Sequence, residues 1–309
     1  TVADVDFAAF TWQTNLTYQI TTAHQVWAQA GRGFRAPTVA EMYSPTSLIS
    51  RTEQATGTVV DDLWSSIANP DLKAERSLNL EVGYRYQTDN LLLGVSLFKD
   101  QYSDMIDTVT LVQNPDVIYE SCSRGVCSES QGNQYNTIDN IGETDVKGVE
   151  VEAAWRISRA FSSRLAYSYN EGEKQNGDPL RSINPASAVL GFRYDGANWN
   201  ITANVTHSAA KKAKDAYDST VSDFEAKPYL TDSYTVVDLM GTLDLSPNWQ
   251  LRAGIYNLFD EEYYQWQRVR FVTNWVGSGV RGGVLADGTG LQRYSEPGRY
   301  AKLAISYSF

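Results

Sequence analysis

The chain has 309 residues, enough for one or two ordinary domains, and a hydrophobic content of 42% with a formal net charge of −11. The acidic balance argues against nucleic acid as a partner, because phosphate groups require lysine and arginine. No run of about 18 apolar residues occurs, which excludes a membrane-spanning helix.

The first predicted element, residues 10–20, alternates strictly between two kinds of side chain. Its apolar positions are Phe10, Trp12, Leu16, Tyr18 and Ile20, with Thr14 among them. Its polar positions are Thr11, Gln13, Asn15, Thr17 and Gln19. This period of two predicts a β-strand with one apolar and one polar face. Its length is that of a tilted strand crossing a bilayer, about 9–11 residues.

The same alternation recurs along the chain, near 78–85, 149–157, 164–169, 188–195, 199–206, 251–256 and 301–309. The polar positions include charged residues such as Glu150, Glu152 and Arg193. Charges on an inward face would be costly in the dry core of a sandwich, whereas a hydrated lumen accepts them. The pattern therefore predicts an all-β, antiparallel transmembrane barrel.

The connections alternate between short and long. Short turns are predicted at TTAH, QTDN, SRAFSS, DGAN and LSPN. Long polar loops are predicted at 36–75, 105–134, 171–184, 212–232 and 260–298. Outer-membrane barrels place short turns in the periplasm and long loops outside the cell. The 12% aromatic content also suits the girdles of such a barrel.

This count gives about eleven strands, which leave two open edges and cannot close in a bilayer. We therefore expect the C-terminal part of a larger barrel, with further strands and any export signal upstream of Thr1. The last strand ends on Phe309 at an outward position. That ending resembles the C-terminal signature of bacterial outer-membrane proteins and would place the C-terminus in the periplasm.

The two cysteines, Cys122 and Cys127, lie in the loop predicted at 105–134. Their spacing in a polar segment suits a small surface disulfide formed in an oxidising compartment. A two-cysteine metal site would need further ligands, and the two histidines, His24 and His207, are far away in sequence. We predict the disulfide.

Five segments resemble TonB-dependent receptors and follow one another in that family's order. They are GFRAPTVAEMY, NPDLKAERSLNLEVGY, NIGETDVKGVEVEAAW, NLFDEEYY and PGRYAKLAISYSF. The resemblance implies a barrel of roughly 22 strands filled by an N-terminal plug, which lies outside this chain. It also implies the outer membrane of a Gram-negative bacterium, contact with outer-membrane lipid and lipopolysaccharide, and TonB as the energising partner.

The segments GIYNLFDEEYYQWQRVR and GLQRYSEPGR look most like the branch that includes haem, haemoglobin and transferrin receptors. The resemblance implies uptake of haem or of iron from a haem-protein, with no intrinsic cofactor. Receptors of this branch typically carry a histidine between the first two segments, and none lies between Pro37 and Asn69 here. A ferric-siderophore receptor of the same superfamily would explain that absence. A passive porin or structural barrel is a third reading.

Tyr43 has the one plausible iron-ligating oxygen between Pro37 and Asn69, as tyrosine serves in some haem proteins. The EMY stretch around it resembles receptors with other ligands, which favours a structural role over ligation. His207 shares the apolar parity of its strand, so it should face lipid, and His24 lies in a turn. The candidate ligand-binding residues are Arg35, Tyr43, Trp64, Trp266 and Arg268. No Ser/His/Asp set or phosphate loop converges, so we expect no enzymatic activity.

Overall fold

A computed structural model describes residues 6–43, 47–53, 59–113, 118–123, 126–131, 134–217, 229–270 and 290–309. Its main feature is one antiparallel sheet of eleven strands in the order β1-β2-β5-β6-β11-β12-β13-β14-β15-β16-β17. The strands are β1 (Trp12–Gln19), β2 (His24–Arg35), β5 (Glu75–Gln87), β6 (Leu91–Ser103), β11 (Thr144–Arg156), β12 (Phe161–Lys174), β13 (Ser187–Asp195), β14 (Trp199–Ser208), β15 (Tyr234–Ser246), β16 (Trp249–Tyr256) and β17 (Tyr300–Tyr307). The predicted all-β class and the predicted number of barrel strands are confirmed.

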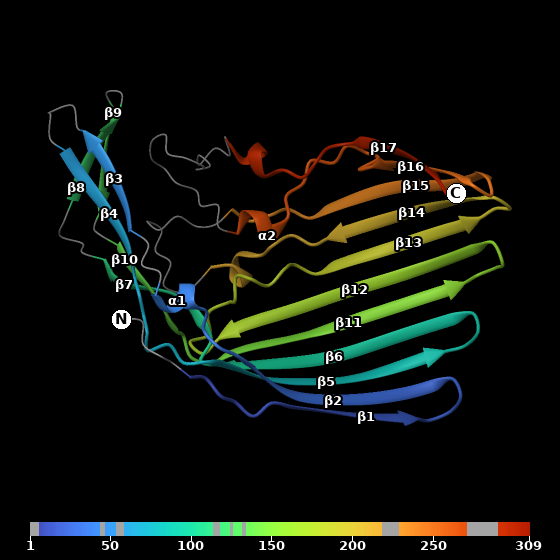
Figure 1. Cartoon of the computed structure of the whole chain (residues 1–309), viewed down its shortest axis with the longest axis horizontal. Coiled ribbons are helices and arrows are strands. Elements are labelled where there is room, and N and C mark those ends of the chain that lie inside the picture. The colour runs from blue at the N-terminus through green and yellow to red at the C-terminus, as the bar shows by residue number, and fades with distance from the viewer. Residues whose placement is uncertain are drawn as a thin grey trace.

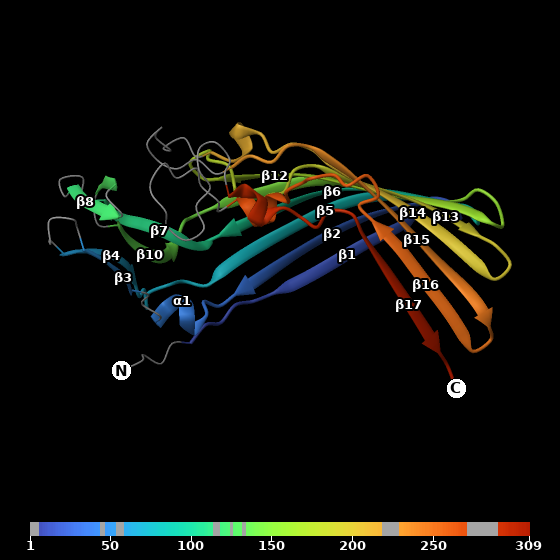
Figure 2. The same cartoon turned by 90° about the horizontal axis from the view of Figure 1, so that it is seen from above.

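The sheet is curved into an open arch whose two edges are β1 and β17 (Figures 1 and 2). Short turns join the strands at one end, which is also the end where the chain terminates, and the long connections gather at the other (Figure 1). The alternation of short and long connections is therefore confirmed. Among the described residues, no helix combines the length and the hydropathy needed to cross a membrane.

Cross-strand register places the apolar side chains on one face of the sheet. Val82 lies opposite Leu97, Leu97 opposite Val149, and Val149 opposite Tyr169. Residues directly opposite in an antiparallel ladder point to the same side. Leu97 is 54% exposed on this face although it is a large apolar residue in the middle of a sheet. A continuous exposed apolar face of this kind marks a surface that meets lipid or protein.

The other face is polar. Gln13 lies opposite Gly31, which lies opposite Asn79. Glu150 lies opposite Ser96, in the row that continues through Gly83 to Trp27. Gly83 is required there, because a Cβ atom on it would come within 2.0 Å of the Trp27 ring. The two faces follow the parity that the sequence predicted.

The first two long connections differ from the predicted irregular loops. The first contains α1 (Val39–Tyr43), β3 (Ser47–Glu53) and β4 (Val59–Ile67), and the second contains β7 (Ile106–Gln113), β8 (Ile118–Ser123), β9 (Val126–Gln131) and β10 (Gln134–Asn140). These strands form a sheet in the order β3-β4-β10-β7 and a separate pair β8-β9, which extend beyond the main sheet (Figure 1). The second connection also runs to residue 143, nine residues past its predicted end.

Candidate binding site at the long-loop end

The base of the first long connection is held by a capping box. Glu41 accepts hydrogen bonds from the backbone N–H of Thr38 (2.7 Å) and from its hydroxyl (2.9 Å). In return the Thr38 hydroxyl accepts the Glu41 N–H at 3.2 Å, so the first turn of α1 is satisfied from both sides. Partial burial raises the pKa of Glu41, but these hydrogen bonds and the charge of Arg35 outweigh it and leave the pKa below its usual value.

Arg35 joins this turn to the main sheet. Its guanidinium forms ion pairs with Glu41, at 3.0 Å, and with Glu75 on the neighbouring strand β5. Glu75 also accepts the backbone N–H of Ile106, at 2.8 Å, from the start of β7. Arg35 thus links the end of β2 to the start of β5 and to α1. Through Glu75 it is also linked to the second long connection. Its charge is already neutralised by two carboxylates.

A small apolar cluster lies beside this tie. Met42, Leu72 and Ile106 are buried, and Phe7, Tyr43 and Ile138 pack against them. Tyr43 is half-buried at the margin of the cluster. It packs there at the base of the first long connection.

Asparagine side chains fix the end of that connection. Asn140 donates to the backbone carbonyl of Lys73 at 3.0 Å and accepts the Lys73 N–H at 2.8 Å. Asn69 donates to the carbonyl of Ile138 at 3.0 Å. The segment that begins with Asn69 is therefore held in place by the chain leading into β11.

A second tie fixes the last long connection. Asn257 is buried, adopts a left-handed conformation with φ of 51°, and donates its N–H to Asp238 at 2.8 Å. Its side-chain amide donates to the carbonyls of Glu261 (2.8 Å) and Pro297 (3.3 Å) and accepts the Glu261 N–H. Asparagine suits such a site, because it tolerates left-handed backbone and bonds to nearby backbone groups.

The long connections after β14 and β16 form a buried cluster, here called the loop core, which consists of Ala216, Trp266, Val269 and Leu291. Trp266, in α2 (Trp266–Val269), is 3% exposed and donates its indole N–H to the carbonyl of Arg181 at 2.8 Å. The core is completed by η2 (Leu291–Tyr294), and η1 (Ala213–Asp215) lies directly before Ala216. The connections after β12, β14 and β16 are therefore packed as one unit.

A buried lysine contacts the loop core. Lys211 is 5% exposed, its ammonium donates to the carbonyl of Ile183 at 2.8 Å, and it lies 4.9 Å from the centre of the Trp266 ring. The geometry is a cation–π contact with little surrounding water, where such contacts are strongest. Burial lowers the pKa of Lys211.

Tyrosines surround the loop core. Tyr217, Tyr229, Tyr264 and Tyr294 are half-buried against it, and the rings of Tyr229 and Tyr264 meet edge to face at 6.0 Å. Burial, and then the hydrogen bond to Glu262, raise the pKa of Tyr264 to about 12. The Tyr264 hydroxyl donates to Glu262 at 2.7 Å.

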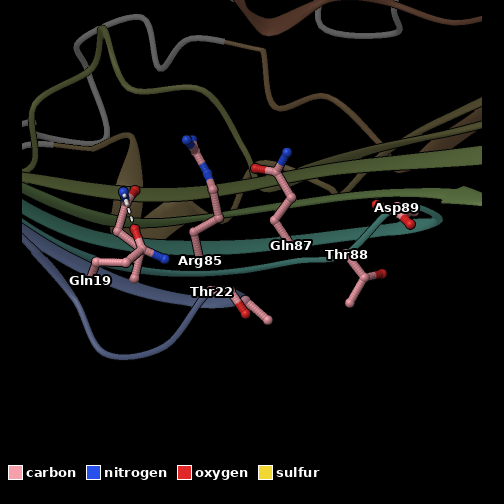
Figure 3. A pocket seen from close by; sticks show the side chains of 8 residues that line it. Gln19, Thr22, Arg85, Gln87, Thr88 and Asp89 are labelled. Carbon is pink, nitrogen blue, oxygen red and sulfur yellow. Dashed lines mark hydrogen bonds between the residues drawn. The ribbon is translucent and has the colours of Figure 1, made fainter.

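The polar face of the sheet also has two hollows. One, of 470 Å³, is lined by residues that include Trp27, Arg85 and Glu152. Arg85 lies 5.5 Å from the centre of the Trp27 ring and 3.3 Å from a Glu152 oxygen. The other, of 370 Å³, lies at the short-turn end, where Arg85 and Gln87 project side by side from β5 (Figure 3). Both are open polar surfaces of the wall.

The structure places the predicted binding residues in two separate groups. Arg35 and Tyr43 lie at the base of the first long connection, whereas Trp266 and Arg268 belong to the loop core. Arg268 is exposed at its side chain and pairs with Glu296 at 2.7 Å. Trp64 lies in β4, with its side chain outside the described residues.

The structure also shows where the two cysteines and the two histidines lie. Cys122 and Cys127 lie directly opposite each other in the pair β8·β9, but their side chains lie outside the described part, so the disulfide stays a prediction. His207 is exposed on the apolar-parity face, opposite Ala188, with Nδ1 2.9 Å from the Thr235 hydroxyl. His24 begins β2, with Nδ1 2.6 Å from the Tyr84 hydroxyl.

The burial of Lys211 could not be predicted, because the run SAAKKAKD reads as a solvated segment and nothing in it marks which lysine is buried. The contacts of Lys302 with Tyr256 and Tyr300 could not be predicted either, because each of these residues fits an ordinary lumen position.

Comparison with known proteins gives a consistent result. The family model described as TonB dependent receptor-like, beta-barrel, matches residues 1–258. A probable hemoglobin and hemoglobin-haptoglobin-binding protein of Haemophilus influenzae is 26% identical over 92% of this chain. Hemoglobin-haptoglobin utilization protein B of Neisseria meningitidis is 28% identical over 98%. The chain spans 28% and 37% of the lengths of these two relatives.

Solved structures show the same fold. A ferric enterobactin receptor mutant from Pseudomonas aeruginosa, in complex with enterobactin, is 25% identical and superposes with a TM-score of 0.70. That alignment covers 97% of this chain and 40% of the receptor. The copper transporter OprC, at 19% identity and a TM-score of 0.67, is covered to 39% by 96% of this chain.

Proposed function

This chain belongs to the TonB-dependent receptor family, and from that premise we propose that it forms part of an outer-membrane receptor that takes up haem or the haem of a host protein, energised through TonB. The family is one of receptors and transporters. The observation that carries the ligand assignment is the alignment of 90% or more of this chain with proteins named for haemoglobin binding or for hemoglobin-haptoglobin utilization.

The two faces of the sheet support the location. The apolar face, with Val82, Leu97 and Val149 in one row, suits the hydrocarbon layer, and the polar face with Glu150 suits a hydrated lumen. In this orientation the long connections lie outside the cell and the short turns in the periplasm. Outer-membrane lipid and lipopolysaccharide are then the partners of the apolar face.

The loops supply the site. The ties at Arg35 and Asn257 and the loop core fix three or more connections before a ligand arrives, which lowers the entropic cost of binding. Among the predicted site residues whose side chains are described, Arg268 is the most exposed, and we assign it to direct ligand contact. Arg35, Tyr43 and Trp266 act by holding the loops, and Trp64 remains a candidate contact.

A ferric siderophore is the second candidate ligand. It is favoured by the absence of histidine between Pro37 and Asn69 and by the structural match to the ferric enterobactin receptor. Titration of the purified full-length receptor with haemin, haemoglobin and ferric enterobactin separates the two. A shifted Soret band with haemin, and a stable complex with haemoglobin, is the expected result. Binding of the siderophore alone would overturn the haem assignment.

A further inference from the structure

Two tyrosines and a lysine gather on the polar face of the last two strands. Tyr256 of β16 lies opposite Tyr300 of β17, and Lys302 lies opposite Gly254 in the next row of that face. Their neighbours of the other parity, Ile255 and Leu303, are on the exposed apolar face. The three side chains therefore project from the wall towards the lumen.

Their contacts make one compact group. The two rings are stacked with centroids 4.9 Å apart and planes 14° apart. The Lys302 ammonium lies 5.5 Å from the centre of Tyr256 and 5.3 Å from that of Tyr300. Gly254 leaves room for this arrangement, because a Cβ atom there would lie 3.0 Å from Cε2 of Tyr256.

Lys302 has no counter-charge in the described part of the chain, where no carboxylate oxygen lies within 4.0 Å of its ammonium. Two arginines on the same face are neutralised: Arg85 meets Glu152 at 3.3 Å and Arg193 meets Asp195 at 2.6 Å. An ammonium beside two phenol groups is a donor set that suits an anion.

Two acidic groups close to Tyr263, Asp238 and Glu296, have other partners. Asp238 accepts the N–H of Asn257 at 2.8 Å, and Glu296 pairs with Arg268. Next to the group, the rings of Tyr234 and Tyr263 meet at 4.4 Å. Burial raises the pKa of Tyr263 to about 12, so its hydroxyl is a neutral donor at physiological pH.

We propose that Lys302, Tyr256 and Tyr300 form a carboxylate-binding subsite on the lumen wall, and that it takes a propionate group of haem during uptake. The proposal rests on the proposed function and assigns residues to it. The ammonium supplies the charge, and the two hydroxyls supply donors that fix the position of the carboxylate. The stacked rings hold the lysine in place without neutralising it.

The test compares haemin with haemin dimethyl ester, in which both carboxylates are blocked. Affinities are measured from the Soret band with the full-length receptor and with Lys302→Met. The double variant Tyr256→Phe/Tyr300→Phe keeps the rings and removes the donors. Lys147→Met is the matched control, because Lys147 lies on the apolar-parity face, paired with Glu171 at 3.3 Å.

The wild-type receptor should bind haemin about tenfold more tightly than the ester, as expected for one charge-assisted hydrogen-bonded contact. Lys302→Met should lose that preference, because it should weaken the binding of haemin and leave that of the ester unchanged. The double phenylalanine variant should show a smaller preference, and Lys147→Met should show the same preference as the wild type. If Lys302→Met weakened the binding of both ligands equally, or left the preference unchanged, Lys302 would be a structural residue of the barrel wall and the proposed subsite would be wrong. A wild-type receptor that binds neither porphyrin would overturn the proposed function as well.

Discussion

Replacing Lys211 should weaken the packing of the long connections around the loop core. Lys211→Met keeps a long unbranched side chain but removes the hydrogen bond to the Ile183 carbonyl and the contact with the Trp266 ring. A hydrogen bond from a charged group contributes about 1.5–3 kcal/mol, and a desolvated cation–π contact about 2 kcal/mol. Because the substitution also removes the cost of burying the charge, roughly two-thirds of this sum is offset.

The net effect on the closure of the three connections is then about 1.5 kcal/mol, which corresponds to roughly tenfold more frequent opening. Hydrogen exchange of the full-length receptor in detergent measures it as tenfold faster exchange in α2 and around Ala216. The control is Lys212→Met, the same substitution at the adjacent exposed lysine, which should leave exchange unchanged. Equal protection in the two variants would refute the idea that the lysine ties the loops together.

Three further outcomes are expected. Asn257→Ala should lower the free energy of unfolding by about 2–4 kcal/mol, because it removes buried hydrogen bonds at a residue with left-handed backbone. Asn257→Gly relieves only the backbone strain, so in a denaturant titration it should recover less than half of that loss. The pKa of Tyr264 is raised to about 12 in the packed loops, so its contribution to stability is complete below a pH of about 10 and is lost as the pH rises through 12; Tyr264→Phe should remove one group from the tyrosinate absorbance change near pH 12. Unfolded, unreduced protein should show no titratable thiol if Cys122 and Cys127 are joined, and two thiols would disprove the disulfide.

The sheet could be predicted because its pattern is local. Each strand carries its own alternation, so Leu80, Val82 and Tyr84 mark a lipid-facing side without knowledge of any neighbour. The rest depends on contacts between distant segments. The parallel pairing of Tyr135 with Ser65, for example, joins two different long connections, and no periodicity within either connection reveals it.

The buried lysine shows the same limit on a smaller scale. Lys211, Lys212 and Lys214 are chemically equivalent in the sequence, and all three are expected to be solvated. Only Lys211 lies where the backbone bonds to Thr231 and the side chain reaches both Ile183 and Trp266. Which lysine is buried is decided by the packing of three connections that are far apart in the chain.

The segments that identify the family are the ones that hold the loops in place. The first contains Arg35 and the capping box of Thr38 and Glu41, and the fourth begins at Asn257; each is occupied with hydrogen bonds at a loop base. A residue that makes these hydrogen bonds at a loop base cannot be exchanged to suit a different ligand. This explains how receptors for enterobactin and proteins named for haemoglobin binding can share these strands with the present chain. Under the proposed function, we expect the choice of ligand to depend on side chains such as Arg268 and Lys302.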